Sequence, residues 1–300
     1  MRLPVKKTYK LYVGGAFPRS ESGRSYEAEG ANVARASRKD LRDAVRAARE
    51  ALPKWAGMTA YNRGQVLYRV AEIMEGRRAQ FVELVGDEDE VDGAIDTWVW
   101  YAGWADKLAQ VLGSSNPVAG PYFNFTVPEP TGVVGVVAPE EPALAGFVAR
   151  LAPAIVGANT TVVVASEKHP LAAVTLAEVL ATSDVPGGVV NVLTGRKDEL
   201  CPVLAAHMDV NAVDLAGEAV EDADRPVDDR HARAADLVHE RDREPHAVAE
   251  EGDAHHVDEP GRDLERGRHP LDGRRECDGG RHDFRQSLAD QRGVAREDVR

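Results

Sequence analysis

Three apolar runs decide the fold: TGVVGVVAP (131–139), TTVVVAS (160–166) and GGVVNVLTG (187–195). Runs of this kind, rich in Val and nearly free of charge, are typical of strands covered on both faces. Helical patterns over 147–159 and 171–183 separate the runs, and residues 210–217 are compatible with a fourth strand. Because strands that alternate with helices form parallel sheets, we expect an α/β fold with a doubly wound parallel sheet.

Ligands of such sheets bind in the crevice at the carboxyl ends of the strands. In this chain those ends lie near residues 138–141, residues 165–167, Gly195 and Gly217. This placement follows from the fold class alone, so it identifies neither a ligand nor a reaction.

A helical lead-in over about residues 37–112 precedes the sheet. Apolar residues recur at three- and four-residue steps from Ser37 to Pro53, where we expect the first helix to end. Two further helices are predicted over about 61–84 and 91–111. Before them, KLYVGGAF (10–17) is typical of a short hairpin turning on two glycines.

The third predicted helix is aromatic, and we expect its large side chains to pack in the core rather than to line a ligand site. The residues concerned are Trp98, Trp100, Tyr101 and Trp104.

Composition divides the 300 residues into two unlike parts. The chain has a net charge of −13, and residues 221–300 hold 23 acidic residues, 15 Arg and no Lys. Acidity argues against nucleic-acid binding, and no run is long enough to span a membrane. Two cysteines are too few for a disulfide framework and are not spaced as a zinc site, so no metal site is expected. Without a signal-peptide pattern, the expected location is the cytoplasm.

Residues 218–300 are too charged to bury a core, so we expect a low-complexity, disordered tail. Cys277 lies there among charged residues, which does not favour a catalytic role. Residues 221–300 contain Arg but no Lys and are rich in Asp, Gly and Ala. GC-rich codons encode this composition when the sequence is not selected to form a hydrophobic core. A frameshift near residue 217 is therefore a hypothesis that sequencing the codons for residues 214–225 would test.

Five segments, in order, resemble the aldehyde dehydrogenase family: YAGWADK (101–107), PEPTGVVGVVAP (128–139), LAPAIVGANTTVVVAS (151–166), LAEVLATSDVPGGVVNVLTG (176–195) and HMDVNAVDLAG (207–217). The resemblance covers about residues 10–217 and implies the amino-terminal, nucleotide-binding part of the family fold. We therefore expect residues 1–217 to form one structural part, and the tail from residue 218 onward lies outside the resemblance.

The resemblance implies NAD(P)-dependent oxidation of an aldehyde to a carboxylic acid. Members of the family attack the carbonyl with a Cys thiolate, pass hydride to nicotinamide and release the acid with a Glu-activated water. An Asn donor for the oxyanion corresponds here to Glu141, whose carboxylate cannot donate a hydrogen bond. Neither the Cys loop nor the Glu segment has a counterpart after Gly217, so no catalytic residue is predicted, and Cys201 is expected to be a buried, inert thiol.

The resemblance places the NAD(P) site at the strand ends, at Ala138, Pro139, Glu167, Gly195 and Gly217, without a GxGxxG motif. Several of the family's coenzyme residues are replaced. Ala165 stands for the Lys that binds the adenosine ribose. Lys197 and Cys201 stand for two glycines that admit the adenosine, and Glu218 adds negative charge near the diphosphate. Binding of NAD or NADP is therefore expected to be weak or absent.

Three functions stay open at this point: the family's oxidoreductase activity, a catalytically inactive partner of a full-length aldehyde dehydrogenase, and a nonfunctional frameshifted fragment. Residues 118–130 fall in the region that forms the family's oligomerisation hairpin, which implies a homo-oligomer or a hetero-oligomer. The residues favour the second or third function over the first.

Overall fold

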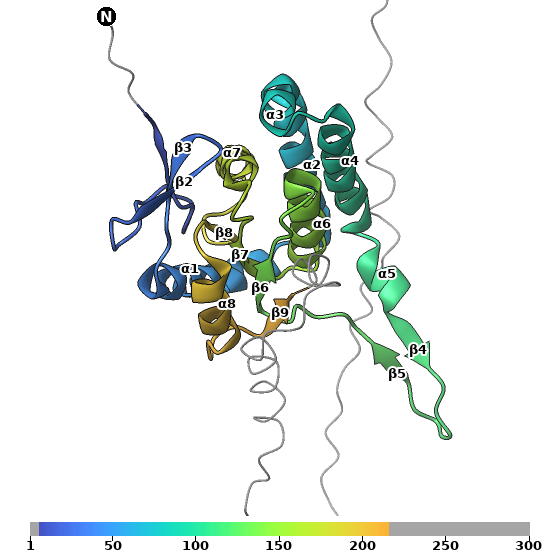
Figure 1. Ribbon diagram of the computed structural model, residues 1–300. Coiled ribbons are helices and arrows are strands. Elements are labelled where there is room, and N and C mark those ends of the chain that lie inside the picture. The colour runs from blue at the N-terminus through green and yellow to red at the C-terminus, as the bar shows by residue number, and fades with distance from the viewer. Residues whose placement is uncertain (1–5, 216–300) are drawn as a thin grey trace, which may run out of the picture. The chain divides into compact units, whose positions relative to one another are not determined.

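The computed structural model describes residues 6–215, and these residues are built around a four-stranded parallel sheet. Its strands are β6 (Val133–Val137), β7 (Thr160–Val164), β8 (Val190–Leu193) and β9 (Ala212–Asp214). Their order is β8-β7-β6-β9 (Figure 1), so the chain moves outward from β6 to β8 and then returns to the other side of β6. All three pairings are parallel, which confirms the predicted doubly wound sheet.

Helices cover both faces of this sheet. On one face, α6 (Ala143–Val156) and α7 (Pro170–Ala181) share a hydrophobic core with Val163 of β7. On the other face, α1 (Arg38–Ala56) and α8 (Lys197–Ala205) share a core with Val162 and Val164. Successive residues of a strand point to opposite faces, so a strand between two layers must be apolar throughout. This explains why β6, β7 and β8 are continuous apolar runs.

The lead-in forms four helices beyond α1, where the sequence predicted two. They are α2 (Ala60–Gly76), α3 (Arg78–Val85), α4 (Glu88–Trp104) and α5 (Leu108–Leu112). Arg77 has φ −110° and ψ 12°, which are not helical values, and it separates α2 from α3. The apolar stripe continues across such a break, so periodicity alone does not reveal it.

Pro53 does not end the first helix, contrary to the sequence prediction. It lies inside α1, which continues to Ala56, and the Gly57 N–H donates to the Pro53 carbonyl at 3.0 Å. The start of α1 is as predicted. The Ser37 side chain accepts from the Asp40 N–H while the Asp40 carboxylate accepts from the Ser37 N–H, which forms a capping box.

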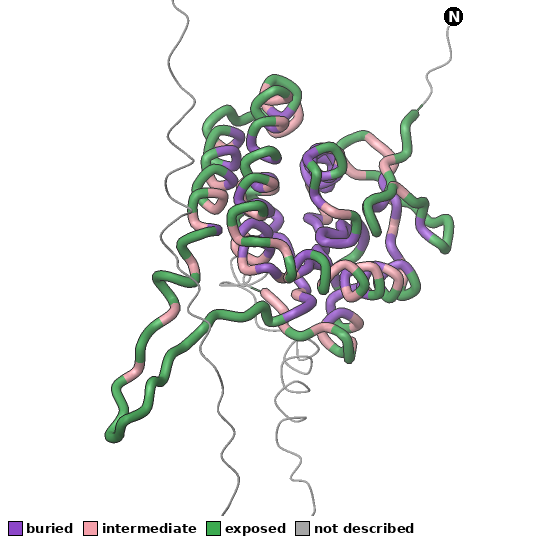
Figure 2. Tube along the Cα trace, turned by 180° about the vertical axis from the view of Figure 1, so that it is seen from behind, coloured by how far each residue is buried: buried purple, intermediate pink, exposed green. Residues whose placement is uncertain are grey.

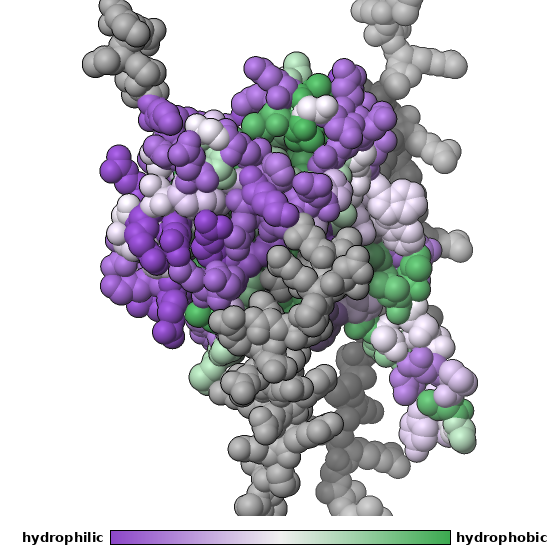
Figure 3. All heavy atoms as spheres, viewed as in Figure 1, coloured by the Kyte–Doolittle hydropathy of each residue, from purple (hydrophilic) through white to green (hydrophobic). Residues whose placement is uncertain are grey.

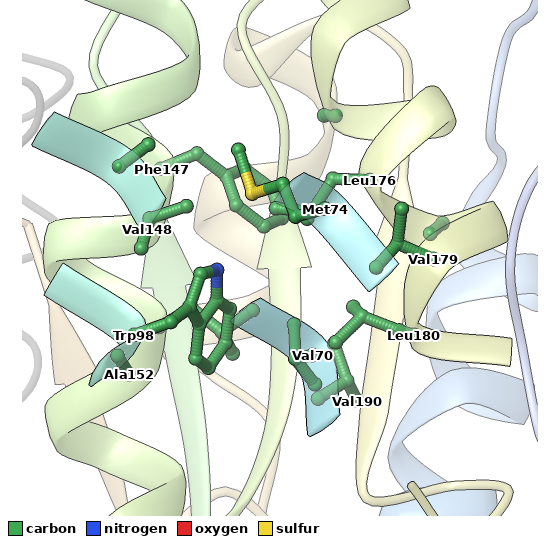
Figure 4. Close-up of a cluster of buried hydrophobic side chains, with 14 of the residues drawn as sticks. Val70, Met74, Trp98, Phe147, Val148, Ala152, Leu176, Val179, Leu180 and Val190 are labelled. Atoms are coloured by element: carbon green, nitrogen blue, oxygen red, sulfur yellow. The ribbon is translucent and has the colours of Figure 1, made fainter. Parts of the chain in front are cut away.

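The aromatic helix α4 contributes only part of its aromatic side chains to the core. Trp98 is fully buried and points between α4 and α6, beside Val148 and Ala152 (Figure 4). Trp100 is 61% exposed, so the expectation that the whole cluster packs in the core is wrong for this residue. Trp100 lies two positions from Trp98, which turns it to the far side of the helix.

The segment before α1 extends the sheet. Tyr12 pairs antiparallel with Val192, with N···O distances of 3.0 and 2.7 Å, and so covers the outer edge of β8. The predicted turn on two glycines is present: Gly14 and Gly15 have φ of 61° and 83°, values that suit glycine. A separate three-stranded sheet contains β1 (Thr8–Tyr9), β2 (Ser25–Ala28) and β3 (Ala31–Ala34).

A hairpin of β4 (Ser114–Asn116) and β5 (Asn124–Thr126) extends beyond α5 (Figure 1). Nearly all of its residues are exposed (Figure 2). One face carries a polar ladder in which the Asn116 side chain donates to Asn124 at 3.1 Å and to Thr126 at 3.0 Å. The alternate positions, Phe123 and Phe125, belong to the other face, where their rings lie 5.3 Å apart.

Candidate site at the strand ends

The carboxyl ends of β6, β7 and β8 lie in register at one edge of the sheet. The Ala138 N–H donates to the Val164 carbonyl, and the Ala165 N–H donates to the Leu193 carbonyl, both at 2.9 Å. Four of the five residues predicted to bind coenzyme, Ala138, Pro139, Glu167 and Gly195, therefore follow strands that end at this edge. Gly217, the fifth, lies outside the described residues, as do Glu218, Cys277 and the whole predicted tail.

The predicted apolar positions at this edge are packed. Ala138 and Pro139 are buried, and a Cβ on Gly146 of α6 would come within 2.4 Å of the Pro139 ring. A Cβ on Gly195 would lie 3.2 Å from the Ala36 nitrogen, so glycine at 195 lets the chain before α1 approach β8 closely. Ala165 is fully buried in the hydrophobic core.

Glu140 forms the centre of the edge, and the sequence had not singled it out. Its side chain is only 4% exposed, and its carboxylate accepts from the Ser166 hydroxyl at 2.6 Å and the Lys168 N–H at 3.0 Å. The Glu167 N–H donates to it at 3.2 Å, and the Lys197 ammonium lies 2.6 Å away. Four donors from the segments that follow β7 and β8 thus satisfy one buried acid.

These donors fix the ionisation of Glu140. Burial by itself would raise the pKa of this carboxyl, but the hydrogen bonds from Lys197, Ser166 and the Lys168 N–H outweigh burial and lower the pKa to about 2. Glu140 is therefore a carboxylate at neutral pH, and it neutralises Lys197 within the fold.

Glu167 is a second carboxylate engaged within the chain. It accepts from the Arg196 guanidinium at 2.9 Å and from the Lys197 N–H, which is the first backbone donor of α8. The Arg196 guanidinium also stands 5.4 Å from the Tyr26 ring. Burial raises the pKa of Tyr26 and the negative charge of Glu167 adds to the rise, so this hydroxyl stays protonated.

The other two helices that begin at this edge are also capped by acids from distant segments. Glu90 of α4 accepts from Leu144 and Ala145 in the first turn of α6, at 2.8 and 3.0 Å. Glu29, in the turn between β2 and β3, accepts from the Leu171 N–H in the first turn of α7 at 3.1 Å. The partial positive charge of a helix N-terminus favours such acids.

Glu141 faces away from this network. It is 74% exposed, and its carboxylate lies 3.5 Å from Nε2 of His169, which also lies 3.5 Å from Glu29 through Nδ1. A hollow of about 540 Å³ opens beside these residues, and Asp87 and Glu90 also line it. The lining is acidic, which suits neither a phosphate nor a developing oxyanion.

The residues at the edge do not fit a dinucleotide. A diphosphate needs unclaimed backbone donors or cations at a helix N-terminus. Here Glu90, Glu29 and Glu167 already hold donors of α6, α7 and α8, and Lys197 is paired with Glu140. Lys197, which stands for one of the two glycines of the family, lies in this network, and Cys201 is buried on α8 as expected.

Glu167 and Gly195 lie at the predicted edge of the sheet, but the residues that form the hydrogen-bond network there were not predicted from the sequence. Glu140 and Lys197 are 57 positions apart, and nothing in either local pattern indicates that they pair. Glu29 and Glu90 come from stretches to which the sequence analysis assigned neither an element nor a role at the sheet. An acid directly after a buried strand was the one signal that pointed to Glu140.

Metal clusters and membrane-spanning helices are both absent from residues 6–215. No group of three or more His, Cys, Asp or Glu side chains there is arranged to hold a metal ion. In the same part of the chain, none of the helices has the length and apolar character to cross a membrane.

Comparisons with known proteins agree with the fold. The chain is 30% identical over 232 residues to the putative aldehyde dehydrogenase DhaS of Bacillus subtilis (strain 168), covering 71% of this chain and 46% of the relative. It is 32% identical over 235 residues to human retinal dehydrogenase 2, covering 72% and 45%. This chain thus spans less than half the length of either relative.

Solved structures give the same result. The NAD+ complex of aldehyde dehydrogenase from Bacillus cereus superposes with a TM-score of 0.65 at 27% identity, covering 69% of this chain and 45% of that one. The NAD-dependent aldehyde dehydrogenase from Sinorhizobium meliloti gives a TM-score of 0.64 at 28% identity, with the same coverage of 69% and 45%. The sequence model of the "Aldehyde dehydrogenase family" matches residues 24–221, two thirds of the chain. The chain therefore belongs to the aldehyde dehydrogenase family, whose nucleotide-binding fold it carries.

Proposed function

We propose that this chain is a non-catalytic member of its family that associates with a full-length aldehyde dehydrogenase through the β4–β5 hairpin. The observation that carries the proposal is the group of exposed aromatic side chains on that hairpin and its turn, where Tyr122, Phe123 and Phe125 are 77%, 78% and 58% exposed. Apolar residues cover part of the hairpin surface in Figure 3. Contiguous exposed aromatic side chains mark interaction surfaces.

The geometry of the hairpin supports association through its strands. With only two strands, its outer backbone groups have no neighbouring strand among the described residues. Such an edge is a template for pairing with another chain. Val111 and Leu112 of α5 are also exposed at the base of the hairpin, at 58% and 61%, and extend the apolar surface.

The family's oxidoreductase activity does not suit these residues. Glu141 stands where the family has an Asn, and loss of one oxyanion donor raises the barrier by roughly 2.7–4 kcal/mol. A carboxylate at that place adds repulsion. The 300 residues also contain no counterpart of the family's Cys loop or Glu base. We therefore propose that this chain does not oxidise aldehydes by itself and binds NAD or NADP weakly or not at all. Its low cysteine content suits the reducing cytoplasm, where we place it.

The association is tested by co-expressing the full chain with a tagged full-length aldehyde dehydrogenase from the same genome. We expect co-purification in a stable complex, and we expect the triple variant Tyr122→Ser, Phe123→Ser, Phe125→Ser to abolish it. The matched control is Tyr61→Ser with Tyr68→Ser, which removes exposed aromatics from α2 and should leave the complex intact. Self-association without the partner would favour a homo-oligomer, and equal yields with both variants would refute the proposal.

A second candidate is favoured by the composition of residues 218–300, with 15 Arg and no Lys in the last 80 positions. It is a frameshifted product without a function of its own. Sequencing the gene across the codons for residues 214–225 tests it. An intact alternative frame encoding apolar-periodic sequence would support the shift, and its absence would refute it.

A further inference from the structure

The strand-end edge pairs both of its central cations with carboxylates of the same chain. Lys197 is bound by Glu140, and Arg196 is bound by Glu167. Lys197 is also only 9% exposed, so its ammonium depends on Glu140 for charge compensation. An incoming anion would have to displace Glu140 before it could reach the enclosed ammonium of Lys197, and it would compete with Glu167 for Arg196, whose side chain is 47% exposed.

The same carboxylates occupy backbone donors that an anion would use. Glu140 takes the N–H groups of Glu167 and Lys168, which lead into α7. Glu167 takes the N–H of Lys197 at the start of α8. These groups lie over the ends of β7 and β8, where the family resemblance places the adenosine half of a dinucleotide.

We infer that Glu140 and Glu167 act as a built-in occupant of the strand-end crevice. Their carboxylates hold the two cations and the helix N-termini that an anionic ligand would otherwise bind. At this edge, carboxylates of the chain itself compete with an anionic ligand for the same cations and N–H groups. This competition adds to the replacement of the family's coenzyme-binding residues. This inference rests on the proposal that the chain does not bind a dinucleotide, and it supplies a cause for that property.

Competition within the chain has a consequence that simple loss of residues does not have. Removal of an internal carboxylate frees a cation and a backbone donor together, so the edge gains affinity for an anion. Glu167 is the better residue to remove, because it is only half-buried and the buried pair of Glu140 and Lys197 remains intact. In the variant Glu167→Ala, the Arg196 guanidinium and the Lys197 N–H become available to the phosphate group of a ligand.

The experiment measures the melting midpoint of the full chain with and without ADP, inorganic pyrophosphate or NAD+ at millimolar concentration. We expect no shift for the wild type and a rise with ADP and pyrophosphate for Glu167→Ala, since ligand binding to the native state raises the midpoint. The control is Glu178→Ala, which removes a carboxylate from the far end of α7, where it pairs with Arg77 at 2.8 Å. It should gain no response.

Two outcomes would overturn the inference. One is a wild-type midpoint that rises with ADP as much as that of Glu167→Ala, which would show that the crevice is open. The other is a folded Glu167→Ala variant that responds to no anion, which would show that the carboxylate does not compete. A second variant, Glu167→Gln, keeps the shape and removes the charge, and should respond less than Glu167→Ala but more than wild type. The hairpin co-purification is measured separately, so either proposal can fail alone.

Discussion

Glu140 places a buried negative charge at the carboxyl end of the sheet, and this charge needs partners. A buried carboxylate is costly unless it is paired and hydrogen-bonded. Here Ser166, two backbone N–H groups and Lys197 meet both of its oxygens. Removing one partner of such a pair typically costs about 3–5 kcal/mol because the other charge stays buried alone. The charges of Glu140 and Lys197 are therefore stabilised mainly by each other and not by water.

The low pKa of Glu140 predicts a loss of stability in acid. Its pKa of about 2 in the folded state lies below the roughly 4.3 of an unfolded chain. The stabilisation is thus fully present above about pH 4.3 and is lost as pH falls through about 2, with a magnitude on the order of 3 kcal/mol. We expect the difference in unfolding free energy between wild type and Glu140→Gln to shrink across this window. Urea denaturation at stepwise pH measures it, and a constant difference would contradict the assignment.

At the scale of elements, the strands were easier to predict than the helix ends. β6, β7 and β8 lie inside the predicted runs because burial on both faces leaves a continuous apolar signal. Arg77 and Pro53 were misjudged for a different reason. The apolar stripe crosses Arg77 unbroken, and Pro53 is tolerated in the last turns of α1, so tertiary packing decided both boundaries.

The strand-end site also has a part that could be predicted from the sequence and a part that could not. That Glu167 and Gly195 lie at one edge was predictable, because the carboxyl ends of parallel strands meet there. Its contents were not predictable, since Tyr12, Glu29 and Glu90 reach the sheet from segments far away in sequence. A local pattern carries no information about such partners.

The contact between α2 and α4 gives a prediction at this scale. A Cβ on Gly64 of α2 would lie 2.9 Å from the Ala102 carbonyl oxygen and 3.2 Å from the Ala105 Cβ, so the two helices approach closely there. Gly64→Ala should lower stability by roughly 1–3 kcal/mol through overpacking. Gly93→Ala on α4, where a Cβ meets nothing within 4 Å, should instead raise it by roughly 0.5–1 kcal/mol. Thermal denaturation separates the two, and equal effects would mean that the close approach is absent.

At the scale of the whole molecule, the chain combines a well-packed half of the family fold with a strand-end edge that is already satisfied. The family's activity needs coenzyme, nucleophile and oxyanion donor in one place. The relatives that it matches are about twice as long as the matching part, and the 300 residues here carry no counterpart of the Cys loop. Under our proposal, this chain keeps the packing of the family fold without its chemistry.

This separation predicts that the purified full chain produces no NADH from aliphatic or aromatic aldehydes with NAD+ or NADP+. Under our proposal, Glu141 would repel a developing oxyanion, and the carboxylates of Glu140 and Glu167 occupy cations and backbone donors that an anionic ligand would use. Absorbance of the reduced coenzyme measures the rate, with a full-length aldehyde dehydrogenase as positive control and heat-treated chain as background. The thiol variants Cys201→Ala and Cys277→Ala should be indistinguishable from wild type. A steady rate above background that disappears in Cys277→Ala would show that this chain has a working nucleophile, and the non-catalytic assignment would then be wrong.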